Sequence, residues 1–214
     1  MGKEKILKVI KKGARNKVIL GVILGIISAF MTLVLIVAAE DDGGVWVGVV
    51  IFAALLVGCI VLTVFGVKEL KDPMRASAIK KNPELLHMAD ELYANKTFED
   101  DFIVLSDRII ANSKNPLEMA YTDEIFLIYV YTHKTNGITD QKQLKLENAR
   151  GTIGVNIMLK KDNEVDALVQ RVCENCKHAR VGYTPEGLDY LKQMRELWKR
   201  DQASKHTTVN GQII

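Results

Sequence analysis

Two long apolar segments near the N-terminus form the strongest pattern in the sequence. Residues 18–39 and 45–67 contain no Asp, Glu, Lys or Arg. Each segment has the length of about 20 residues that a helix needs to cross the hydrocarbon of a bilayer. Only Glu40-Asp41-Asp42-Gly43-Gly44 separates them. The pattern therefore predicts a transmembrane hairpin over residues 18–67.

Buried helices of a soluble core and a cleaved signal peptide give similar patterns. Two charge-free runs of this length, so close together, are unusual in a small globular core. Val37 and Ala39 resemble the small residues that precede a cleavage site, but the apolar part of a signal peptide is shorter, about 7 to 15 residues. Membrane-spanning helices are the preferred interpretation, and cleavage would still leave the second segment.

Residues 1–17 form a basic amphipathic segment before the first span. Ile6, Leu7, Ile10 and Ala14 recur at helical spacing, and lysines occupy the remaining arc. Such a segment is typical of a helix that lies in the membrane interface. A solvated topology signal is the equally supported alternative.

Small residues recur every four positions within both spans. They are expected to let two helix backbones approach closely, either within the hairpin or between copies of the chain in a homo-oligomer. The predicted helix-packing positions are Gly21, Gly25 and Ala29 in the first span and Ala54 and Gly58 in the second.

The remaining sequence predicts a linker over residues 68–82, an α+β domain over residues 83–200 and a disordered tail over residues 201–214. Asn82-Pro83-Glu84 has the residues of a helix start. Helices are also predicted over residues 163–176 and from Thr184 onward, because apolar residues recur there at helical spacing.

Between these helices the pattern is that of an antiparallel meander. A tight hairpin is predicted around Ser106-Asp107, a strand covered on both faces over residues 125–131, and a type I′ turn at Asn136-Gly137. The next strand contains Leu144 and Leu146, and alternating residues 153–159 predict another strand. Residues 180–183 predict a short extended piece.

Charge sets the expected orientation of the spans. Lys and Arg flank both spans, whereas the short loop between them has none. The positive-inside rule therefore places both termini in the cytoplasm and the acidic loop outside, in a multi-pass protein of the cell membrane. The basic flanks would contact anionic lipid headgroups as well as the lipid bilayer itself.

The predicted domain is mildly acidic, although the whole chain has a formal net charge of +3. Residues 82–214 contain 17 Lys or Arg and 20 Asp or Glu. Nucleic acid is thereby disfavoured as a partner, because polyanion binding requires a concentrated basic surface.

Cys173 and Cys176, with His178 close by, are the candidate redox or metal residues. A structural zinc site normally needs four ligands, and no second pair with suitable spacing exists. Both cysteines continue an apolar stripe, so packing in the core is the preferred interpretation. No catalytic residue and no cofactor is predicted, because phosphate-binding glycine loops and nucleophile elbows are absent.

The segment Phe102-Ile-Val-Leu-Ser-Asp-Arg-Ile-Ile110, followed by Met119-Ala-Tyr-Thr-Asp-Glu-Ile125 before a strand, resembles the opening of bacterial pleckstrin-homology-like (PH-like) domains. The later strands and the following helix fit the same order over residues 100–175. The resemblance implies a binding or assembly role. The lipid site of some members is not carried over, because the first hairpin turn offers only Arg108, and phosphoinositide headgroups require several donors.

These patterns predict a membrane-anchored, noncatalytic binding or scaffold module. Its cytoplasmic domain would dock a protein partner or a membrane component. The alternative is a thiol redox or metal-sensing membrane protein that uses Cys173 and Cys176.

Overall fold

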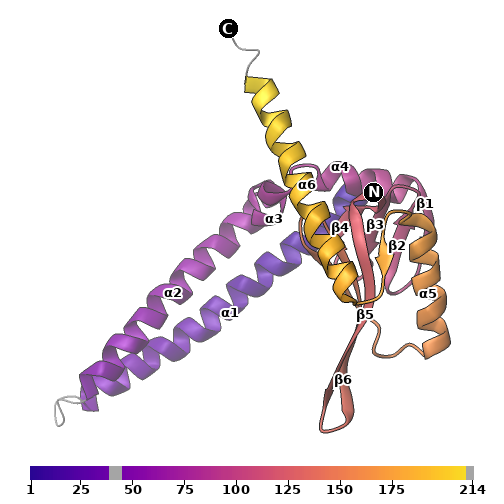
Figure 1. The fold of residues 1–214 in the computed structure, drawn as a ribbon. Coiled ribbons are helices and arrows are strands. Elements are labelled where there is room, and N and C mark those ends of the chain that lie inside the picture. The colour runs from indigo at the N-terminus through magenta and orange to yellow at the C-terminus, as the bar shows by residue number, and fades with distance from the viewer. Residues whose placement is uncertain (39–44, 211–214) are drawn as a thin grey trace. The chain divides into compact units, whose positions relative to one another are not determined.

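A computed structural model describes residues 1–38 and 45–210 (Figure 1). The chain forms two compact units, residues 3–86 and residues 87–214 together with Met1 and Gly2. We call them the hairpin unit and the sheet unit. The predicted external loop at residues 40–44 lies outside the described residues.

The hairpin unit contains two long helices, α1 (Gly2–Ala38) and α2 (Trp46–Lys71). Helix α1 continues without a break through the predicted boundary between residues 17 and 18, so the amphipathic segment and the first apolar segment form one helix. Both helices are long and apolar enough to cross a membrane, judged by length and composition.

The two helices pack against each other as an antiparallel pair. A Cβ placed on Gly66 would lie 3.0 Å from the carbonyl oxygen of Ala14, and one on Gly48 would lie 3.1 Å from Leu35. Glycine therefore permits close approach near both ends of α2. Near the charged end of the pair, Lys17 Nζ donates to Glu69 Oε2 at 2.7 Å.

The predicted linker contains two short helical elements, η2 (Pro73–Arg75) and α3 (Ser77–Lys81). Asp72 initiates η2 by accepting a hydrogen bond from the amide of Met74. Helix α4 (Leu85–Ala94) begins just after the predicted Asn82-Pro83-Glu84 start. The linker is therefore structured as well as polar.

The sheet unit contains two four-stranded sheets in place of the single predicted meander. The first has the order β1 (Lys96–Glu99), β2 (Ile103–Ser106), β3 (Ile109–Asn112), β4 (Met119–Tyr121). Neighbouring strands in it are antiparallel. Strands β1 and β4 were not predicted, because each is short and has no alternating pattern of its own.

The second sheet has the order β7 (Thr152–Asn156), β6 (Ile138–Asn148), β5 (Ile125–Thr135), β8 (Arg180–Val181). Strand β8 pairs parallel to β5, so the sheet is mixed and only partly fits the antiparallel prediction. Asn136 and Gly137 have φ values of 52° and 80° at the β5–β6 turn. Left-handed backbone at both residues confirms the predicted type I′ turn.

One core lies between the two sheets and helix α5 (Asp162–Asn175). Glu164 stabilises the first turn of α5 by accepting a hydrogen bond from the backbone amide of Lys161 at 2.9 Å. The stripe of α5 that enters this core contains Val165, Leu168, Val172 and, just after the helix, Cys176. This packing confirms the predicted apolar face.

The short helix η3 (Thr122–Glu124) connects the sheets, and Asn112 joins them by hydrogen bonds. The Asn112 side-chain amide donates to the carbonyl oxygen of Gly154 in β7 at 3.0 Å and to Glu118 at 3.2 Å. Its side-chain oxygen accepts the amides of Lys114 and Asn115. A buried polar group is stable here because its donors and acceptors are all used.

Helix α6 (Pro185–Asn210) packs against the other face of the second sheet (Figure 1). Leu191 of α6 is buried with Phe126 and Leu127 of β5. The helix extends to Asn210, so the predicted disordered tail begins inside it, and residues 211–214 lie outside the described residues.

Arg195 fixes α6 to the β6–β7 turn. Its guanidinium donates to Glu147 Oε2 at 2.8 Å and to the carbonyl oxygens of Gly151 and Asn148 at 2.9 and 3.0 Å. Tyr129 donates its hydroxyl to the same carboxylate at 3.1 Å. Burial, followed by the charge of Glu147, raises the pKa of Tyr129 to about 12, so this donor stays protonated over the physiological range.

Replacing Gly21 by alanine is expected to destabilise the pairing of α1 with α2. The new Cβ would clash with Thr63 Oγ1 and lie 3.0 Å from the carbonyl oxygen of Cys59, and overpacking costs about 1–3 kcal/mol. Gly58→Ala is the matched control, since nothing lies within 4 Å of its added Cβ. Titration of both variants with SDS, followed by circular dichroism, measures the difference. Equal stability would contradict the packing.

Arg195→Met is expected to lower the free energy of unfolding by about 1–3 kcal/mol, because hydrogen bonds to charged groups are lost and Glu147 keeps its charge. Lys199→Met, an exposed position on the same helix, is the control. Urea unfolding in detergent, followed by Trp198 fluorescence in a Trp46→Phe background, gives the two midpoints. An unchanged midpoint for Arg195→Met would show that the contact contributes no stability.

Candidate functional site

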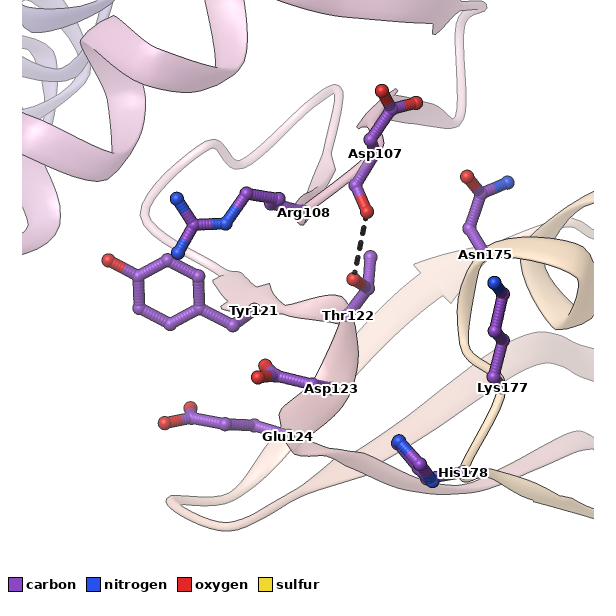
Figure 2. Close-up of a pocket in the computed structure, with 9 residues that line it drawn as sticks. All are labelled: Asp107, Arg108, Tyr121, Thr122, Asp123, Glu124, Asn175, Lys177 and His178. Atoms are coloured by element: carbon purple, nitrogen blue, oxygen red, sulfur yellow. Dashed lines mark hydrogen bonds between the residues drawn. The ribbon is translucent and has the colours of Figure 1, made fainter.

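A polar hollow of about 460 Å³ opens on the surface of the sheet unit. Figure 2 shows that its lining comes from three segments that are far apart in the sequence. These are the β2–β3 turn, the end of β4 with η3, and the connection from α5 to β8. The lining residues are Asp107, Arg108, Tyr121, Thr122, Asp123, Glu124, Asn175, Lys177 and His178.

The β2–β3 turn is held by side-chain hydroxyls. Ser106 Oγ accepts from the amide of Ile109 at 3.1 Å and closes the turn. Thr122 Oγ1 donates to the carbonyl oxygen of Asp107 at 3.2 Å, as drawn in Figure 2. Because Thr122 is buried, it fixes the position of the turn relative to η3.

Arg108 is engaged by neighbours within the sheet unit. Its Nη1 donates to Glu91 Oε1 of α4 at 3.2 Å, and its guanidinium carbon lies 6.0 Å from the centroid of the Tyr121 ring. Glu91 therefore compensates the positive charge that Arg108 brings to the hollow. This single, compensated arginine is not the cluster of donors that a phosphoinositide headgroup requires.

The η3 segment contributes two carboxylates with different surroundings. Glu124 is half-buried and lies 3.6 Å from Arg150 Nη2. Asp123 is exposed and forms no hydrogen bond or ion pair with any described residue. A charged ligand can therefore approach Asp123 without displacing a protein partner.

The α5–β8 connection brings Asn175, Lys177 and His178 to the other side of the hollow. Cys176 anchors this connection, because its side chain is buried in the core and its amide donates to Val172 at 2.9 Å. The Tyr190 hydroxyl donates to the carbonyl oxygen of His178 at 3.0 Å. The connection thus has fixed contacts on both sides, while the side chains of Lys177 and His178 remain exposed.

The two sequence-predicted cysteines occupy the core side of this connection. Cys176 is 1% exposed, and Cys173 packs against the same core. Burial is the main cause that raises the pKa of both thiols, that of Cys176 to about 12. The thiolate, which is the reactive and metal-binding form, is therefore scarce at neutral pH.

His178 lines the polar hollow, whereas Cys176 belongs to the apolar core. Among the side chains that the structure describes, in residues 1–38 and 45–204, no cluster of three or more His, Cys, Asp or Glu could hold a metal ion. The burial of Cys176 and the raised pKa values of both thiols favour the packing interpretation of the two cysteines.

The predicted helix-packing residues fall on two different faces. Gly21 and Gly25 lie against α2, where a Cβ on Gly25 would be 3.6 Å from Cys59 Cβ. Ala29 lines the same shallow groove as these two glycines. Ala54 and Gly58 line a separate apolar hollow formed by α2 alone, and a Cβ on Gly58 would meet nothing within 4 Å.

Sequence reasoning singled out Arg108 in the β2–β3 turn and His178 as a metal candidate, but it did not predict that they line one hollow with Asp123, Lys177 and Asn175. Asp123, Lys177 and Asn175 are ordinary polar residues of turns and helix ends, with no motif of their own. They become a site only because the packing of α5 brings residues 175–178 near residues 107–108 and 121–124.

Alkylation tests the assignment of Cys176 to the core. In a Cys59→Ala background at pH 7.5, Cys176 is expected to react only after urea unfolding, because burial and the raised pKa suppress its thiolate. Ser204→Cys in the same background supplies an exposed control thiol. Mass spectrometry of the alkylated peptides assigns each site. Fast modification of native Cys176, at the rate of the control, would contradict the assignment.

Comparisons of the chain with family models, with curated proteins and with solved structures found no match. No activity, ligand or partner is therefore transferred to it from a relative.

Proposed function

We propose that this chain is a membrane-anchored, noncatalytic binding module whose ligand occupies the hollow between the β2–β3 turn, η3 and the α5–β8 connection. The observation that carries the proposal is the exposure of the apolar helices. In their most apolar 18-residue windows, 11% of the α1 residues and 6% of the α2 residues are buried.

Such exposure would be costly in water. Large side chains such as Phe30 and Leu33 of α1 and Phe65 of α2 are 59% to 64% exposed. Each Å² of apolar surface removed from water contributes about 25 cal/mol, so a bilayer would stabilise both helices strongly. A helix from a soluble core would instead bury most of such a window.

The flanking lysines support a cytoplasmic location for both termini. Lysines precede the apolar part of α1 and follow that of α2, whereas residues 40–44 carry no positive charge. The positive-inside rule applies most reliably to short flanks like these. Anionic lipid headgroups would be the partners of both basic flanks.

The order of elements supports a PH-like fold for the sheet unit. The β2–β3 hairpin is followed along the chain by the β5–β6–β7 strands and then by α5, which fits the order that the resemblance implies, whereas β1 and β4 are additional. A PH-like unit attached to membrane helices would serve to bind or assemble.

The open character of the hollow favours binding over catalysis. Asp107, Asp123, Lys177 and His178 are all exposed. Catalytic groups gain most of their strength from fixed dipoles in sites that exclude water. Exposed charges on three segments are better suited to recognising a charged ligand or a protein partner.

Cysteine labelling in intact cells tests the anchor and its orientation. Gly43→Cys is expected to react with a membrane-impermeant maleimide added outside, and Ser204→Cys only after the cells are lysed. The unmodified chain, with its native cysteines, provides the background for both. External labelling of Ser204→Cys would contradict the topology, and release of the chain from washed membranes by carbonate would contradict the anchor.

A further inference from the structure

We propose that the hollow binds a zwitterionic group, with the ligand's cation directed to Asp123 and its anion to Lys177. This inference rests on the proposed function and names the class of ligand. The shared chemistry is an ammonium group close to a phosphate or carboxylate, which a lipid headgroup or a soluble compound could supply.

The inference rests on those charged side chains of the hollow that form no ion pair with another side chain of the protein. Glu91 compensates Arg108, and Arg150 compensates Glu124. The side chains of Asp107, Asp123 and Lys177 make no hydrogen bond or ion pair with any described residue. The hollow thus presents two uncompensated carboxylates and one uncompensated ammonium group.

These charges occupy different sides of the hollow. Asp123 belongs to η3, and Lys177 belongs to the α5–β8 connection across from it (Figure 2). His178 and Asn175 add polar groups beside Lys177. The volume of about 460 Å³ falls within the range of about 300–1,000 Å³ for small-molecule sites, so a group with two charges can fit.

A ligand of one sign would match only part of this lining. A simple cation near Asp123 gains nothing from Lys177, and a simple anion near Lys177 gains nothing from Asp123. A single exposed ion pair changes a binding constant by no more than about fivefold. A zwitterion forms both pairs in one binding event, so its preference over either single ion is the distinguishing property.

The test uses the full chain in nonionic detergent and three soluble probes. Glycerophosphoethanolamine carries both charges, ethanolamine only the positive one, and glycerol phosphate only the negative one. Amide chemical shifts of residues 107–108, 121–124 and 175–178 report binding. Glycerophosphoethanolamine is expected to bind about two- to fivefold more tightly than either single ion. Equal affinity for all three probes, or no binding, would overturn the proposal.

Charge reversals provide a readout that a purely structural role would not give. Asp123→Lys is expected to shift the preference toward glycerol phosphate, and Lys177→Glu toward ethanolamine. The double variant should again prefer the zwitterion, bound in the opposite direction. Glu196→Lys and Lys192→Glu on the exposed side of α6 are matched controls. If a charge-reversal variant unfolds the sheet unit, the neutral variants Asp123→Asn and Lys177→Gln are used instead. Each of them should weaken binding of the zwitterion.

Nanodiscs distinguish the two sources of the ligand. If a lipid headgroup is bound, discs containing phosphatidylethanolamine should shift the same amides and block glycerophosphoethanolamine, whereas phosphatidylglycerol discs should do neither. If the natural ligand is a soluble compound, glycerophosphoethanolamine should bind with the same affinity in phosphatidylethanolamine and phosphatidylglycerol discs. Membrane insertion is scored separately by the cysteine labelling, so a lost zwitterion preference with intact insertion would overturn this inference and leave the anchor standing.

Discussion

The packing of α5 against both sheets is the interaction on which the rest of the sheet unit depends. Val165, Leu168 and Val172 share one apolar core with buried residues of both sheets, and Asn112 adds hydrogen bonds between the sheets. The same stripe ends in Cys176, which fixes the start of the α5–β8 connection. A loss of volume at any of these positions would therefore affect the polar hollow as well as the core, since protein interiors are close-packed.

Local signals were sufficient to predict the elements with strong periodicity or special backbone geometry. The α5 stripe was readable because each of its apolar residues has neighbours at helical spacing. The Asn136-Gly137 turn was readable because both residues accept left-handed backbone with little strain. The apolar segments of α1 and α2 could be predicted because neither contains an Asp, Glu, Lys or Arg over the length of a membrane span.

Features that arise from contacts between distant segments could not be predicted. The strand predicted to reach Leu159 ends at Asn156, whose side chain accepts the amide of Met158 and turns the chain, leaving Leu159 92% exposed. The parallel pairing of β8 depends on where α5 returns the chain, which no local pattern records. In the sequence Arg195 has no feature that distinguishes it from other arginines of a helix. Its three acceptors come from the β6–β7 turn, which is far from it in the sequence.

The β5–β6 ribbon extends beyond the strands that flank it (Figure 1). Pairing with β8 involves Leu127 and Ile128, and no other described strand pairs with that edge of β5. Open edges are templates for intermolecular strand addition, which leads to aggregation. Lys134 and the irregular register between His133 and Lys134 disrupt such growth, because a charge and a bulge both spoil a continuous ladder. The charge and the irregular register near the tip therefore make this open edge a poorer template for strand addition by another copy of the chain.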